Sequence, residues 1–494
     1  MAGSVLAGAA AAGLEPAAAD ATAKRRQPRP RTGASKRTVD VAIVGAGFAG
    51  LTAARNLVAA GKSVAVLEAR DRVGGRVWNH DLGGGLVSER GGTFVGPTQD
   101  RVMALATALG IGTFPTYDTG KDLYIADSTR LTWSDAGLTG TAPPDPEILA
   151  GLTLIISELD RLATSVPVEA PWTAANAATW DGQTLQSWLN VQIGDDARFN
   201  EVAALATRAI FGAEPREVSL LFVLFYIASS GDQNNPGTFE RNFDTRGGAQ
   251  QSRFIGGSQT IALKIAERLG NRVVLSTPVR RITQGPGSVT LVSDRMTVTA
   301  KQAVVAIPPA LAARIDYEPI LPFQRDQLTQ RYGQGTLTKV GAVYDTPFWR
   351  GAGLTGQALS TGGPICATFD DSPPGGDPGV VFGFVGGDRA RSYAPLSPAA
   401  RQAAVVDQLV GFFGSQAAKP TAFFETFWSA DPWSRGCPVG IPNVGALVAY
   451  GPWLRQPIGR IHWAGTETAD YWNGYMDGAV RSGERAASEV LAAL

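Results

Sequence analysis

The chain of 494 residues has few of the side chains that form disulfides and bind transition metals. It has two cysteines, Cys366 and Cys437, and two histidines, His80 and His462. Two cysteines are too few for a disulfide framework, and the four residues are not spaced as metal ligands. The sequence therefore predicts neither a disulfide-stapled domain nor a metal site.

The sequence also lacks long apolar runs and an excess of charge of one sign. Its most apolar run, Leu220–Ala228, is far shorter than the ~20 residues of a membrane-spanning helix, so we expect a core helix there. Basic and acidic residues both number 44, which gives no reason to expect nucleic acid or an anionic membrane as a partner. With 44% hydrophobic residues, the chain can bury the cores of two or three domains.

The first 37 residues differ in composition from the rest. They are rich in alanine and glycine and then in proline and arginine, so they offer little to bury, and we expect a disordered tail. The tail partly resembles an export signal, but no basic segment precedes the alanine-rich run. A cytoplasmic location is the prediction, and export through a truncated signal is the alternative.

A glycine-rich turn follows the first apolar strand. Val41–Val44 is predicted to be a buried strand, and glycines at Gly45, Gly47 and Gly50 come directly after it. Residues 51–60 then favour a helix. This order allows a tight turn and a close approach of the backbone to a pyrophosphate at the start of the helix.

A second strand, over residues 64–67, ends in an acidic residue at the distance expected for binding a ribose. Glu68 follows this strand, and a further loop carries Arg70, Gly75 and Arg76. A nicotinamide enzyme has no need of this second loop. In an FAD protein it supplies backbone and arginine donors along the diphosphate and ribityl chain, so the dinucleotide is predicted to be FAD.

A strand–turn–helix pattern recurs near the C-terminus. Ile461–Ala464 is predicted to be a short strand, Gly465–Thr468 a turn, and Trp472–Tyr475 a second turn that opens a final amphipathic helix. The start of such a helix presents free N–H groups and a positive dipole end, which suit the electron-rich edge of a cofactor.

These motifs together resemble the flavin monoamine oxidase family, within the group that also holds polyamine and L-amino-acid oxidases. The resemblance runs from about residue 39 to the end. It rests on five separated motifs: Gly45–Gly50, Glu68–Arg76, Gly91–Gln99, Lys339 with Pro347–Trp349, and Gly465–Gly478. The mitochondrial members carry a C-terminal membrane anchor, and no anchor is expected here.

The resemblance implies an α/β amine oxidase fold, in which a Rossmann-like FAD-binding domain is interleaved with an α+β substrate domain. The FAD-binding domain is expected to use residues 38–113, 236–328 and 431–494, and the substrate domain residues 114–235 and 329–430. Apolar spacing between the motifs predicts helices over residues 147–163, 184–189, 198–211, 218–229 and 398–413, and strands over 338–344 and 380–384.

The resemblance also assigns roles in catalysis. Lys339, in an otherwise uncharged strand, would hold a water near the flavin N5 atom; lysines are rarely buried without a task. Tyr475 would form one wall of an aromatic cage facing the flavin, Trp428 would pack beside the flavin, and Ile210 would line the substrate cavity.

Further residues are expected to bind the cofactor. The predicted set is Gly45, Gly47, Gly50, Glu68, Arg70, Gly75, Arg76, Thr93, Val279, Cys437, Glu467 and Met476. Cys437 matches the cysteine that is bonded to the flavin in mitochondrial relatives, and covalent and non-covalent FAD both stay open, because Pro438 replaces the second cage tyrosine. The second wall would then come from Tyr471, Trp472 or another residue.

The predicted function is FAD-dependent oxidation of an amine to an imine, with O₂ reduced to H₂O₂ and the imine hydrolysed to aldehyde and ammonia. An L-amino-acid or polyamine oxidase is the alternative within the fold, and Arg208, two residues from Ile210, would supply the cation for a substrate carboxylate. A flavin-binding protein without turnover is the alternative from another class. We expect a small amine and O₂ as partners, and a homodimer stays open.

Overall fold

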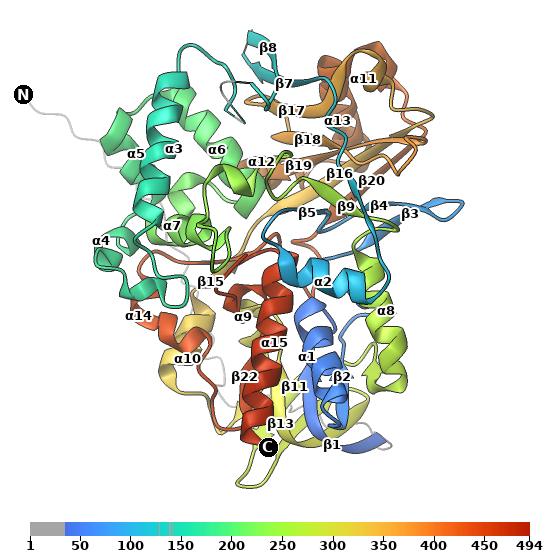
Figure 1. The fold of residues 1–494 in the computed structure, drawn as a ribbon, viewed down its shortest axis with the longest axis vertical. Coiled ribbons are helices and arrows are strands. Elements are labelled where there is room, and N and C mark those ends of the chain that lie inside the picture. Colours follow the sequence, from blue (N-terminus) through green and yellow to red (C-terminus); the bar gives the residue numbers. More distant parts are fainter. Residues whose placement is uncertain (1–34, 128, 138–139, 141) are drawn as a thin grey trace, which may run out of the picture.

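Two large β-sheets organise the molecule, one in each half (Figure 1). The structure is a computed structural model, and it describes residues 35–494 apart from residues 128, 138–139 and 141. The predicted tail over residues 1–37 lies outside the described residues, except for its last three. The lower sheet in Figure 1 combines the two ends of the chain with a middle segment, and the upper sheet is made from residues between them.

Strand β1 lies inside the lower sheet and joins segments that are far apart in the sequence. It pairs in parallel with β2 on one side and with β13 on the other, and β22 pairs in parallel with β13. The strands run in the order β10-β2-β1-β13-β12-β11-β14, with β22 joined to β13. Their bounds are β1 Ser35–Val44, β2 Val64–Leu67, β10 Val273–Val274, β11 Val279–Gln284, β12 Val289–Ser293, β13 Met296–Val305, β14 Asp316–Glu318 and β22 Ile461–Trp463.

The start of β1 corrects one boundary of the sequence prediction. Residues 35–37 were assigned to the tail, but they pair in parallel with residues 296–298 of β13. The reason is that strand pairing uses backbone N–H and C=O groups, so a segment whose side chains stay largely exposed can extend a sheet. The parallel core with its crossover helix confirms the predicted α/β fold class, and the domain boundaries stay a prediction.

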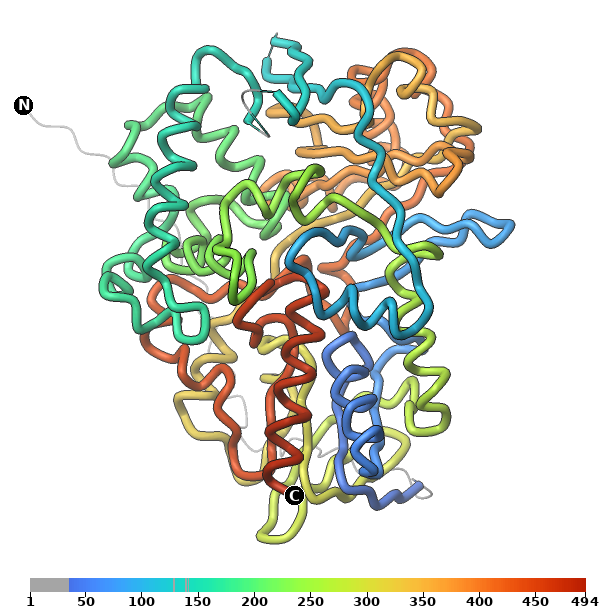
Figure 2. Tube along the Cα trace, in the orientation of Figure 1, coloured from blue at the N-terminus to red at the C-terminus, as the bar shows by residue number. Residues whose placement is uncertain are grey.

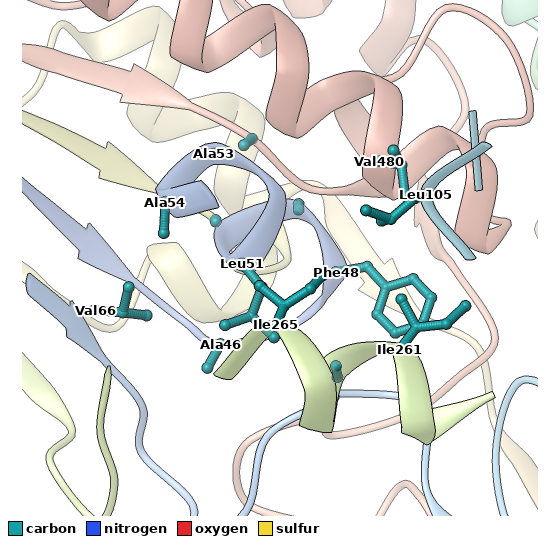
Figure 3. Close-up of a cluster of buried hydrophobic side chains, with 14 of the residues drawn as sticks. Ala46, Phe48, Leu51, Ala53, Ala54, Val66, Leu105, Ile261, Ile265 and Val480 are labelled. Carbon is teal, nitrogen blue, oxygen red and sulfur yellow. The ribbon is translucent and has the colours of Figure 1, made fainter. Parts of the chain in front are cut away.

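Three helices cover the lower sheet and enclose a hydrophobic core: α1 Phe48–Ala59, α8 Gln259–Leu269 and α15 Met476–Ala493. Figure 3 shows Phe48 beside Ile261 and Leu105 beside Val480 in this core. Helix α15 packs directly on α1. The approach is so close that a Cβ atom on Gly483 would lie 2.3 Å from the carbonyl oxygen of Ala49.

The upper sheet has the order β20-β16-β19-β18-β17-β7-β8, and β16 is buried along its whole length. The bounds of its strands are β7 Lys121–Ala126, β8 Thr129–Trp133, β16 Leu337–Tyr344, β17 Leu354–Ser360, β18 Ala367–Asp370, β19 Gly379–Gly386 and β20 Ala422–Phe427. Helices beside it are α3 Leu149–Ala163, α5 Leu185–Ile193, α6 Ala197–Phe211, α7 Leu220–Ser229 and α13 Pro398–Phe413. These elements confirm the predicted helices and strands to within a few residues, and α7 is the expected core helix.

A small sheet, β5-β9-β6, connects the early chain to the middle of the sequence. Its strands are β5 Phe94–Val95, β6 Thr113–Pro115 and β9 Ser252–Phe254, and the hairpin β3 Asn79–Gly83 and β4 Leu86–Glu89 precedes it. The other short elements are β15 Tyr332–Gln334, β21 Gly440–Pro442, α2 Asp100–Ala108, α4 Ala177–Asp181, α9 Pro309–Ala312, α10 Phe323–Gln330, α11 Phe348–Gly351, α12 Gly387–Tyr393 and α14 Ala446–Tyr450. Figure 2 shows how often the chain passes between the two halves. Within the described ranges, no helix combines the length and apolarity needed to cross a bilayer.

Replacing Gly483 with alanine should destabilise the protein, because the added methyl group would meet the Ala49 carbonyl oxygen. Overpacking of this kind costs about 1–3 kcal/mol. Gly411, inside α13, is the matched control: no atom lies within 4 Å of an added methyl group there, and alanine favours a helix by ~0.5–1 kcal/mol. We expect a lower midpoint of thermal unfolding for Gly483→Ala and an equal or higher one for Gly411→Ala. Equal effects at both positions would contradict the tight contact.

Candidate active site

A cavity of about 360 Å³ is lined by residues from both sheets. The ends of β1 and β2, the middle of β16 and the start of α15 all contribute to its wall. Every predicted site residue lines this cavity except Gly50 and Glu467. The lining members of that set are Gly45, Gly47, Glu68, Arg70, Gly75, Arg76, Thr93, Ile210, Val279, Lys339, Trp428, Cys437, Tyr475 and Met476.

The turn after β1 is shaped by its glycines. Gly45 has φ +97°, and a Cβ atom there would lie 2.9 Å from the Ala306 carbonyl oxygen. A Cβ on Gly50 would lie 2.0 Å from the Gly45 carbonyl oxygen, so Gly50 shapes the turn without lining the cavity. Gly47, by contrast, has no atom within 4 Å of an added Cβ. It precedes α1, which has no side-chain cap, so the free N–H groups of the helix start are available to an anion.

Glu68 is fixed by the backbone around it. The residue is 3% exposed, and its carboxylate accepts hydrogen bonds from the Ala46 N–H (2.7 Å) and the Arg70 N–H (2.9 Å). The Arg70 side chain is held in turn by Asp431 (3.1 Å) and Ser434 (2.7 Å). Each carboxylate oxygen of Glu68 keeps further acceptor capacity at the cavity wall, as binding of a ribose hydroxyl requires.

Glu467 acts on the cavity through Arg76. The two side chains form a bidentate ion pair, with N–O distances of 2.6 and 3.1 Å, and Glu467 also accepts a hydrogen bond from the Gly440 N–H. Arg76 donates as well to the Pro438 carbonyl oxygen at 2.8 Å. Glu467 therefore positions Arg76 and does not itself line the cavity.

Lys339 is the buried cation of the site. It is 1% exposed, and its Nζ atom donates to Thr93 Oγ1 (2.7 Å) and to the Gly91 carbonyl oxygen (3.2 Å). Nζ also lies 3.6 Å from the centre of the Phe382 ring. Burial lowers the pKa of Lys339 to about 8, against the attraction of the carboxylates Asp371 and Glu89, so the amine can lose its proton near neutral pH.

The aromatic wall of the cavity includes a residue that sequence reasoning missed. Tyr475 donates to Asn242 Oδ1 at 3.1 Å, and the ring of Tyr226 lies 5.7 Å from the Tyr475 ring. Tyr226 lines the cavity, whereas neither Tyr471 nor Trp472 does. In the sequence, Tyr226 differs from its neighbours only in carrying a hydroxyl group within the otherwise apolar run Leu220–Ala228.

Cys437 and Trp428 lie together at the cavity wall. With Leu337 they form a small buried cluster, and Trp428 Nε1 donates to the Arg90 carbonyl oxygen at 3.0 Å. The Cys437 thiol lies 3.7 Å from the Leu337 carbonyl oxygen. Burial raises the pKa of Cys437 to about 12, although the positive charges of Arg76 and Lys339 act in the opposite direction.

A second cavity of about 190 Å³ shares Ala209, Ile210 and Tyr226 with the first. Its wall is mostly aliphatic and aromatic, and it includes two carboxylates, Asp122 and Asp135. Among the described residues that line it, none is a lysine, arginine or histidine.

Arg208 lines neither cavity, contrary to the sequence prediction. It is buried and forms ion pairs with Glu214 (2.8 Å) and Glu201 (3.0 Å). The physical reason is helical geometry: two positions along an α-helix correspond to a rotation of about 200°, so Arg208 and Ile210 point to different sides of α6. The residue proposed to bind a substrate carboxylate is therefore paired elsewhere.

Comparison with known proteins decides the family. The sequence profile of the flavin-containing amine oxidoreductases matches residues 48–491. The chain belongs to this family. It is a flavin-containing amine oxidase, as predicted, and its reaction is the oxidation of an amine with O₂ as acceptor.

Relatives are similar over almost their full lengths. The Mycobacterium tuberculosis protein AofH, whose name places it among flavin-containing monoamine oxidases, is 42% identical over 92% of this chain and 97% of its own. Putrescine oxidase from Kocuria rosea is 36% identical over 92% of this chain and 95% of its own. The structure of cyclohexylamine oxidase from Brevibacterium oxydans IH-35A has a TM-score of 0.86 and 36% identity, over 92% of this chain and 99% of that one. This similarity confirms the predicted amine oxidase fold.

The amine oxidase cavity fits the flavin dinucleotide that the family requires. The space beside Gly47 and the uncapped start of α1 suit a diphosphate, and Glu68 presents a carboxylate at the end of β2, where a ribose would lie. The start of α15, at Met476, adds a second uncapped helix terminus to the same cavity.

Replacing Glu68 with glutamine should weaken FAD binding about tenfold or more. The amide keeps the shape of the side chain but loses the charge that strengthens its hydrogen bonds, each worth roughly 1.5–3 kcal/mol. FAD affinity would be measured by titration of apoprotein in a Cys437→Ala background, which excludes a covalent bond. The control is Asp71→Asn, an exposed carboxylate that does not line the cavity. Unchanged affinity in Glu68→Gln would contradict the ribose assignment.

Proposed function

We propose that the first cavity holds the FAD ring against the substrate, with Lys339 on one side and the aromatic pair Tyr475 and Tyr226 on another. The observation that carries this proposal is the meeting of a buried lysine and two tyrosines in a cavity that begins at a dinucleotide-binding turn. When bound in this cavity, FAD would supply the redox chemistry, taking up the hydride equivalent of the amine and passing the electrons to O₂. The protein supplies orientation, exclusion of water and a titratable amine.

Each residue has a role that follows from its contacts. The hydrogen bond to Asn242 fixes the Tyr475 ring, so that the ring can orient the neutral amine of the substrate. Lys339 lies among buried groups and holds a water or a proton at Nζ, where its pKa of about 8 allows both protonation states near neutral pH. Ile210 and Tyr226 line both cavities, so they mark the passage through which the amine reaches the ring.

The second cavity supports an amine substrate over an amino acid. Its described wall offers apolar surface and two carboxylates and lacks a cation for a substrate carboxylate. A diamine is the second candidate, because the Kocuria rosea relative is named a putrescine oxidase and because Asp122 presents to this cavity a carboxylate that forms no ion pair within the described residues, whereas Asp135 is held by Arg246 at 3.1 Å. A peroxide assay with benzylamine, tyramine, putrescine and L-leucine would test this ranking of substrates, in which monoamines come first, the diamine second and the amino acid last. The homodimer and the cytoplasmic location stay predictions.

Replacing Lys339 with methionine should slow amine oxidation or flavin reoxidation by at least about tenfold, while the visible spectrum of the bound flavin stays nearly intact. The reason is loss of the group that holds water and protons at the ring. In the wild type, the affected step should depend on pH with a midpoint near 8, where the Lys339 ammonium loses its proton as the pH rises. The variant should lack this transition. Stopped-flow measurement of both half-reactions checks this, and unchanged rates in both would refute the role of Lys339.

We further propose that Cys437 is the point of covalent FAD attachment. It lines the cavity beside Trp428, and Gly436 before it has φ +140°, where glycine avoids steric strain. Burial raises the pKa of the Cys437 thiol to about 12, and the positive charges of Arg76 and Lys339 offset part of that rise. Formation of a thioether removes one hydrogen from the thiol and one from the flavin methyl group, and O₂, the acceptor of the established reaction, takes the two electrons.

Acid precipitation of the holoprotein should leave the yellow colour in the pellet. Cys437→Ala should release FAD into the supernatant, because it removes the only thiol among the described residues that line the cavity. Cys366→Ala is the matched control: Cys366 is equally buried and free but does not line the cavity, so the colour should stay with the protein. FAD released from the wild type would rule out the bond.

A further inference from the structure

A buried network of charged residues adjoins Lys339 and has no role in the mechanism above. Arg253 forms ion pairs with Glu89 (2.8 Å) and Asp371 (2.9 Å). All three side chains are at most 3% exposed. Asp371 also accepts hydrogen bonds from the Ser88 hydroxyl and from the Glu89 N–H. Buried ion networks are costly to form and are weak as sources of stability, so their presence beside a reactive amine calls for an explanation.

The network holds both ends of the segment that binds Lys339. Gly91 and Thr93 accept the two hydrogen bonds of Lys339 Nζ. Glu89 lies just before this segment and is ion-paired with Arg253, and Phe94 lies just after it and pairs with Arg253 in the antiparallel contact of β5 with β9. Arg253 therefore fixes the segment through its side chain on one flank and its backbone on the other.

The network also balances the charge of the amine. Two carboxylates, Glu89 and Asp371, are matched by the two cations Arg253 and Lys339, so loss of the Lys339 proton leaves one negative charge in excess. Glu89 Oε1 is buried and has no hydrogen-bond partner in the described part of the chain. A buried carboxylate oxygen without a hydrogen bond favours a neighbouring positive charge and opposes the effect of burial on Lys339.

The other groups that face Lys339 do not provide this balance. Strand β19 presents Phe382 and Phe384, and β20 presents Thr426 opposite Lys339. Besides the network, the Cys437 thiol also acts on the amine, and burial raises the pKa of that thiol to about 12. Arg253 and the Ser372 carbonyl that it contacts line a separate cavity of about 600 Å³, so the network lies between two cavities.

We propose that Glu89, Asp371 and Arg253 are positioning residues for Lys339, which fix its ammonium group and set the pH at which it loses its proton. This inference rests on the proposed function only where it links Lys339 to catalysis. The network itself is a property of the protein residues. Its signature is a change in the protonation of Lys339 when a neighbouring buried carboxylate is neutralised.

The test is competitive labelling of amines in the holoprotein with trace acetic anhydride between pH 6 and 11. Mass spectrometry of the Lys339 peptide gives the midpoint of its titration. Glu89→Gln and Asp371→Asn should each lower this midpoint by about one pH unit or more, because at an effective dielectric constant of ~20 the loss of one charge roughly 12 Å away corresponds to about one unit, and the loss of a closer charge to more. Glu89→Asp, which keeps the charge, should restore the midpoint toward the wild-type value.

The matched control is Glu425→Gln. Glu425 is also paired with an arginine, Arg401, and lies on β20, beside β16. It pairs with Val340, the neighbour of Lys339, and adjacent residues of a strand point to opposite faces, so its charge lies on the other side of the sheet. The midpoint should not move in this variant. Thermal unfolding identifies any variant that fails to fold, and either of the two carboxylate variants suffices for the test.

The outcomes separate this inference from the role of Lys339 in catalysis. If the labelling midpoint and the pH profile of turnover shift together, both are supported. A shift in labelling without a shift in turnover supports the network and refutes the catalytic role of Lys339. A midpoint that stays at the wild-type value in a folded Glu89→Gln or Asp371→Asn variant overturns the network proposal.

Discussion

The parallel pairing of β1 with β2 and β13 is the constraint on which the site depends. This pairing places the carboxyl ends of β1 and β2 at one edge of the sheet, where Gly45 and Glu68 face the same cavity. Through β13 it also fixes β22, and the turn after β22 leads to Tyr475. A displaced register in this one sheet would move the glycine turn, Glu68 and Tyr475 at the same time.

Around this sheet, ion pairs between buried or partly buried side chains organise the cavity. Glu467 holds Arg76, Asp431 holds Arg70, and Arg253 joins two carboxylates. Such pairs contribute little net stability, because desolvation offsets the attraction between the charges. Their value lies in geometry, since each pair fixes a loop that presents backbone groups to the cavity. An enzyme that must exclude water from a reacting amine needs this order before the substrate arrives.

The parts of the site that the sequence predicted are those encoded by local patterns. The glycine turn, Glu68 and the start of α15 each lie within a strand–turn–helix segment whose order is visible in a few residues. Tyr226 and the network of Arg253 were not predicted, because the partners of Arg253 lie 164 residues before it, at Glu89, and 118 residues after it, at Asp371. Arg208 was wrongly placed because proximity in sequence does not give the direction of a helical side chain.

The late position of β22 and α15 in the chain has a consequence for biosynthesis. A ribosome completes β1, the glycine turn and Glu68 several hundred residues before it reaches Tyr475 and Met476. Until then, the apolar face of α1 lacks the helix that covers it, and the cofactor cavity lacks one wall. The nascent enzyme therefore carries exposed apolar surface until α15 is made, and we expect cofactor capture only after that helix has been synthesised.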